Sequence, residues 1–126
     1  METLEGLLHV LKFLFWALAA HLFHYRQNFY HWSLWVPVIS IYFLAANLFL
    51  AEFYGANWVL TLLAITLVSV IVTNLWGAYL HWDGVKSRVG GDNVHNHMVG
   101  PPVILPLIVA TVATIDLLRL LQGGIN

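Results

Sequence analysis

The chain has no cysteine and few charged residues. The absence of cysteine among its 126 residues excludes disulfide bonds, thiolate metal sites, iron–sulfur clusters and covalently attached haem c. Only 9% of the residues are charged and 60% are hydrophobic, with a mean hydropathy of +0.79, whereas soluble domains are about 25% charged and about 45–50% apolar. So few polar side chains cannot cover a water-soluble domain, and the composition therefore predicts an integral membrane protein.

Positive charge is also scarce. Five Lys and Arg residues against six Asp and Glu residues give a net charge of -1, and the sequence contains no basic run that would attract nucleic acid. We therefore expect no nucleic-acid partner. The seven histidines are the main chemical resource, since a metal ion would have to be bound by His, carboxylate or carbonyl groups.

Four apolar stretches are long enough to cross a bilayer, because about 20 helical residues span a hydrocarbon layer about 30 Å thick. They comprise residues 4–23, 33–53, 57–82 and 102–121. The first two links are short, which favours antiparallel neighbours. The sequence thus predicts an all-α fold in which residues 1–126 form one domain, an up-down bundle of four transmembrane helices in the lipid bilayer.

The third link, residues 83–101, is longer and contains several glycines, and we expect an irregular loop there. By folding back over the helix ends, it would bring His95 and His97 above His21 and His81. The alternative is that it only reverses the direction of the chain.

Most histidines fall on one membrane face when the four spans alternate in direction. Six of the seven reach this face, namely His21, His24, His31, His81, His95 and His97. The same face receives three basic residues, Arg26, Lys86 and Arg88, against two on the other, Lys12 and Arg119. The positive-inside rule then places the histidine-rich loops in the cytoplasm, by a margin of one residue.

Small residues accompany the histidines of the first and third spans. Ala17, Ala20, His21 and His24 follow the spacing i, i+3, i+4, i+7, and Asn74, Gly77, Ala78 and His81 repeat it, so each set shares one helix face. Such faces leave room for a flat ring, and two histidines from different helices can be the axial ligands of haem b. The predicted cofactor-binding residues are His21, His24, His81, Gly77, Ala78, Ala17 and Ala20.

Three other interpretations of these residues stay open. One histidine could ligate a chlorophyll-type pigment, or the gap could hold a quinone. All six clustered histidines could instead form a non-haem transition-metal site at the membrane surface, with Asp83 or Asp92 adding a carboxylate. Finally, small residues at helical spacing are also the usual means of close helix packing in membranes.

Charged and titratable residues also meet on the opposite membrane face. The predicted intramembrane cluster comprises His9, Lys12, Glu52 and Asp116. Lys12 is expected to enter the hydrocarbon depth, where charged side chains face the bundle interior. It could pair with Glu52 or Asp116, while Asp116 also has Arg119 at i+3. A proton relay is the functional interpretation of this cluster. A structural ion pair is favoured, because no carboxylate lies near the middle of the membrane.

The sequence favours a small redox-associated membrane protein that holds a haem b, pigment or quinone for electron transfer. A rival function is that of a non-catalytic accessory subunit in a respiratory or photosynthetic complex, with other membrane subunits or a second copy as partners. A third is a metal-dependent membrane enzyme. No nucleophilic triad or glycine-rich phosphate loop is recognisable, which favours the second function over the third.

Overall fold

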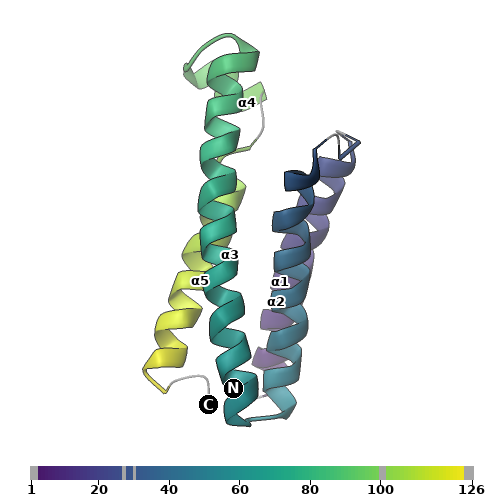
Figure 1. The fold of residues 1–126 in the computed structure, drawn as a ribbon, viewed down its shortest axis with the longest axis vertical. Helices are drawn as coiled ribbons and strands as arrows, with labels where there is room; N and C mark the ends of the chain where they lie inside the picture. Colours follow the sequence, from purple (N-terminus) through teal and green to yellow (C-terminus); the bar gives the residue numbers. More distant parts are fainter. Residues whose placement is uncertain (1–2, 27, 30, 100–101, 124–126) are drawn as a thin grey trace.

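The computed structural model describes residues 3–26, 28–29, 31–99 and 102–123, and every regular element in these ranges is helical (Figure 1). The elements are α1 (Thr3–Tyr25), the 3-10 turn η1 (Trp32–Leu34), α2 (Trp35–Phe53), α3 (Asn57–Gly84), the π turn η2 (Val85–Val89), α4 (Val94–Val99) and α5 (Ile104–Leu121). Four stretches are long and apolar enough to span a membrane: Leu4–Tyr25, Trp32–Phe53, Asn57–Val89 and Ile104–Leu121. The predicted all-α fold with four membrane-spanning helices is therefore confirmed.

The four long helices form two layers. Helix α1 packs on α2, α2 on α3, and α3 on α5, so that α1 and α2 lie on one side of the bundle and α3 and α5 on the other (Figure 1). The fully buried core between them is apolar and includes Phe13, Ile41, Leu44, Leu63 and Leu67. Only 28–33% of each span is buried within the chain. The remaining apolar side chains therefore lie on the outside of the bundle, which fits a multi-pass protein in a lipid bilayer.

The third link differs from the prediction of an irregular loop. Helix α3 continues to Gly84 and passes directly into η2, and α4 follows after a short bend. The reason is the position of the helix-breaking residues: Gly90 and Gly91 adopt φ values of 114° and 124°, which favour glycine and end a helix. The 33-residue stretch Asn57–Val89 is about 50 Å long at about 1.5 Å per residue, so its end projects beyond a hydrocarbon layer about 30 Å thick.

Candidate functional site

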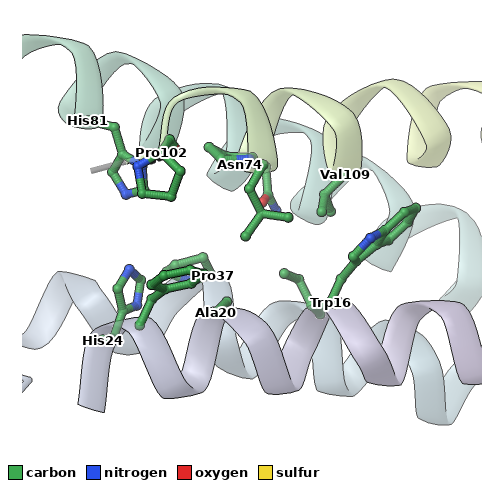
Figure 2. Close-up of a pocket in the computed structure, with 13 residues that line it drawn as sticks. Trp16, Ala20, His24, Pro37, Asn74, His81, Pro102 and Val109 are labelled. Atoms are coloured by element: carbon green, nitrogen blue, oxygen red, sulfur yellow. Dashed lines mark hydrogen bonds between the residues drawn. The ribbon is translucent and has the colours of Figure 1, made fainter. Parts of the chain in front are cut away.

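His24 and His81 meet at one end of the space between the two layers. His24 lies in the last turn of α1 and is 6% exposed, and His81 lies near the end of α3. Figure 2 shows the two imidazoles turned toward one another from opposite layers, and their ring centres are 6.3 Å apart with the planes at 84°. Of the two predicted axial combinations, the structure thus brings together His24 and His81.

Backbone carbonyls fix the orientation of both rings. His24 Nδ1 lies 2.7 Å from the Leu34 carbonyl oxygen, and His81 Nδ1 lies 2.8 Å from the Pro102 carbonyl oxygen. Because a carbonyl oxygen only accepts hydrogen bonds, each Nδ1 carries the proton and donates it. In the neutral form of each ring this leaves the lone pair on Nε2, which is the nitrogen that could then bind a metal.

The carbonyl that holds His81 is free because of a proline one turn later. In a helix, the Pro102 carbonyl would accept a bond from the N–H of residue 106, but that residue is Pro106 and has no N–H. His81 supplies the missing donor. The i, i+4 spacing of these two prolines could have indicated from the sequence that the Pro102 carbonyl is open to another donor. A prediction based on hydropathy and histidine spacing does not consider it.

A hollow adjoins the histidine pair on two sides. A slot of about 50 Å³ runs between the layers from His24 and His81 to Trp16 (Figure 2). A second cavity of about 310 Å³ extends toward the outer side of α2 and α3, and both cavities share the two histidines, Pro37 and Gly77 as walls. The histidine pair therefore stands inside one widened region of the bundle.

The small residues predicted around a cofactor divide into two groups. Ala20 lines the slot, and Gly77 lines both cavities. Ala17 is 0% exposed and belongs to the apolar core, while Ala78 is 6% exposed. The first pair therefore borders the hollow, and the second pair permits close helix packing.

His21 lies in an aromatic cluster beside the pair. Its Nδ1 is 3.3 Å from the Tyr42 hydroxyl, and the rings of Phe29 and Trp35 lie 5.7 and 5.9 Å from its own. Phe29 stacks on Trp35 at 3.7 Å, also contacts His24 edge-on, and adopts a positive φ of 44°. A bulky side chain rarely takes that backbone conformation. Phe29 was not predicted as a site residue, since only its three-dimensional contacts identify it.

The remaining histidines of this face are separate from the pair. His31 bonds to Ser33, His97 bonds to Asp92 at 2.5 Å, and His95 is exposed. In the described ranges no contact joins His95 or His97 to His21 or His81, and no three His, Cys, Asp or Glu side chains are grouped to hold a metal ion. The site formed here is therefore a two-histidine site.

Asp92 anchors α4 to the end of α3. Its carboxylate accepts hydrogen bonds from His97 and from Trp82 Nε1, the latter at 3.0 Å. These two bonds, the His97 bond foremost, hold the pKa of Asp92 below its ordinary value. Asp92 thus stabilises the projecting segment.

A bonded chain of three side chains occupies the opposite end of the bundle. Lys12 Nζ donates to His9 Nδ1 at 2.7 Å, and His9 Nε2 donates to the buried Asp116 carboxylate at 2.6 Å. Lys12 therefore reaches Asp116 through His9, and among the described residues no salt bridge joins Lys12 directly to Asp116 or Glu52. Glu52 is not bonded to this chain and packs over Gly6.

Comparison of the chain with protein families, with curated proteins and with solved structures finds no match.

Proposed function

We propose that this membrane protein binds a b-type haem between His24 and His81 and transfers electrons through it. The observation that carries the proposal is the ring separation. Metal–imidazole bonds are about 2.0–2.1 Å long and the nitrogen lies about 1.2 Å from the ring centre, so two imidazoles on opposite sides of one metal have centres about 6.4 Å apart. The observed separation is 6.3 Å.

The hydrogen bonds of both rings support the same proposal. Histidines that ligate metals usually donate their other N–H to a carbonyl or carboxylate, which fixes the ring and makes the ligating nitrogen more basic. Leu34 and Pro102 provide such carbonyls at 2.7 and 2.8 Å. The absence of cysteine agrees with a haem held by axial histidines alone.

The hollow is too small for a macrocycle, so the layers would have to separate transiently at this end to admit haem, and the lining side chains would then repack around it. The cavities of about 50 and 310 Å³ lie at or below the lower limit of about 300–1,000 Å³ for cofactor sites. The walls of the slot include the small residues Ala20 and Gly77 beside the bulky Trp16 and Phe23, and these two rings would have to move. Bound haem would supply one-electron chemistry, while the chain orients it and excludes water.

A single transition-metal ion is the alternative occupant that the narrow slot favours, because it needs no separation of the layers. Two imidazoles suit zinc, copper, iron or nickel. In either case we infer from the positive-inside rule that the pair lies toward the cytoplasmic face, because Arg26 and Lys86 belong to the same end of the bundle.

The accessory-subunit function is favoured by the exposed aromatic surface. Trp32, Trp58 and Trp76 are 73%, 63% and 62% exposed, and tryptophans are enriched at subunit interfaces as well as at membrane boundaries. Other membrane subunits or a second copy would then cover these side chains. This function and haem binding are compatible, since small cytochrome subunits can do both.

An absorption spectrum of the detergent-purified protein, oxidised and then reduced with dithionite, tests the proposal. We expect a Soret band and, after reduction, a sharp α band, both lost in His24→Ala and His81→Ala and retained in the control His21→Ala. Pro106→Ala restores a backbone donor that competes with His81 for the Pro102 carbonyl, and should weaken haem binding about 10–100-fold. A featureless spectrum would exclude haem and pigment, and metal analysis would then separate a colourless metal site from an accessory subunit.

A further inference from the structure

The outer surface of α1 carries a groove that shares only Phe23 with the slot at the histidine pair. It has a volume of about 470 Å³, and its lining includes Phe15, Leu18, Ala19, Leu22, Tyr25 and Arg26. All these residues belong to α1 or follow it directly, and their side chains other than that of Ala19 are largely exposed. Ala19 is the small residue between bulky neighbours, so it forms the floor of the groove. Because α1 packs on α2, this outer surface opens toward the bilayer.

Arg26 gives the groove one charged end. It follows directly after α1, its side chain is exposed, and its backbone N–H is bonded to the Leu22 carbonyl. Within the described part of the chain, no acidic side chain pairs with its guanidinium. A guanidinium presents several N–H donors in a planar fork that matches a phosphate group. The free charge at the membrane boundary therefore favours an anionic group at this end.

The length of the groove matches one leaflet of a bilayer. Phe15 and Arg26 are eleven residues apart, which is about 16 Å at about 1.5 Å per residue, and half of the hydrocarbon layer is about 15 Å. The spacing of Phe15, Leu18, Leu22 and Arg26 keeps them on one helix stripe. A molecule with its charge at Arg26 and an apolar chain along this stripe would thus fit one leaflet.

We propose that this groove binds an anionic phospholipid. Arg26 holds the phosphate, Tyr25 lies at the head-group level, and one acyl chain lies over Ala19 toward Phe15. Arg26 is the only charged residue that lines the groove, so the lining offers no acidic partner for the cationic part of a zwitterionic head group. A head group with a net negative charge is therefore favoured. This site does not depend on the proposed haem.

Native mass spectrometry of the purified full chain with phosphatidylglycerol or phosphatidylcholine of identical acyl chains tests the site. We expect phosphatidylglycerol to be retained more strongly, and Arg26→Gln to weaken it about fivefold. Ala19→Phe fills the groove and should displace both lipids. The matched controls are Arg119→Gln at the other membrane face and Ala46→Phe on the exposed surface of α2, which should retain wild-type binding.

Three results would overturn the inference. Equal losses in Arg26→Gln and Arg119→Gln would indicate non-specific attraction to cations, and unchanged lipid binding in Ala19→Phe would show that the groove is not occupied by an acyl chain. If wild-type protein formed a dimer that Ala19→Phe abolished without a change in lipid binding, a second copy and not a lipid would cover the groove. None of these variants replaces His24 or His81, so a variant that loses lipid binding should keep the haem spectrum. Likewise, His24→Ala and His81→Ala should keep lipid binding.

Discussion

Replacing Asp116 with alanine should destabilise the bundle more than any other single change at its charged end. The Asp116 side chain is 5% exposed and is bonded to His9 at 2.6 Å. Its removal leaves the His9 Nε2–H without an acceptor and the Lys12 ammonium without the carboxylate that it reaches through His9, and breaking a buried charged network by removing one member costs about 3–5 kcal/mol. Lys12 is only partly buried and can extend toward the membrane surface. We therefore expect a loss of about 3 kcal/mol in the free energy of unfolding.

A triple variant separates the cost of an unpaired charge from the value of the bonded chain. The substitutions His9→Leu, Lys12→Met and Asp116→Leu together remove all three polar side chains of the hydrogen-bonded series Lys12–His9–Asp116. Replacement of a buried ion pair by apolar residues of similar size is often neutral or stabilising. We therefore expect the triple variant to recover at least about 2 kcal/mol relative to Asp116→Ala.

Reversible unfolding in mixed micelles, in which SDS replaces dodecyl maltoside and the loss of helical circular dichroism is followed, measures these differences. The reasoning fails if Asp116→Ala costs less than about 1 kcal/mol, because the carboxylate would then not be compensating a buried charge. It also fails if the triple variant is as unstable as the single one, because shape and not charge would then be the cause. Asp83→Ala, an exposed residue in the last turn of α3, is the control.

Three further predictions concern single contacts. Thr66→Val removes the acceptor of the buried Asn47 amide at 2.7 Å and should cost about 1 kcal/mol in micelle unfolding. Thr61→Val, which loses only a bond within its own exposed turn, should have no measurable effect. Phe29→Gly should be more stable than Phe29→Ala by about 1 kcal/mol, since both lose the Trp35 stack but only glycine adopts a φ of 44° without strain. Equal stabilities would contradict this assignment. The lowered pKa of Asp92 means that its stabilisation of α4 is complete above the unfolded pKa of about 3.9 and is lost as the pH falls through the lower folded value. Amide hydrogen exchange of α4 should therefore accelerate at that lower pH in the wild type and at a higher pH in His97→Gln; identical pH profiles would refute the role of the His97 bond.

The number and approximate limits of the spans could be predicted because hydropathy adds up over about 20 residues. The end of α3 could not, because hydropathy falls at Asp83 whereas the backbone turns only at Gly90 and Gly91. A helix that leaves the membrane loses its apolar character before it loses its hydrogen bonds. The prediction of an irregular loop for residues 83–101 takes the end of the apolar stretch to be the end of the helix.

The choice between His21 and His24 was also beyond the sequence. The two residues are three positions apart and therefore point only about 60° away from each other around α1. The rotation of α1 relative to α3 decides whether His21 or His24 faces His81. The spacing of residues along one helix gives no information on that rotation. The structure reveals the choice through contacts from two other segments, the Leu34 carbonyl on His24 and the Tyr42 hydroxyl near His21.

The two ends of the bundle are held by different chemistry, and this difference bears on how a haem could enter. At the charged end, the His9–Asp116 bond joins α1 to α5 across the layers. At the other end, His24 and His81 are each bonded to a backbone carbonyl of their own layer, and their ring centres lie 6.3 Å apart with the planes at 84°. Separation of the layers there breaks no hydrogen bond of either ring, while the polar chain keeps the far end closed. Asp116→Ala should consequently lower haem retention although it lies far from both proposed ligands, whereas an unchanged spectrum in that variant would mean that the layers need no fixed end.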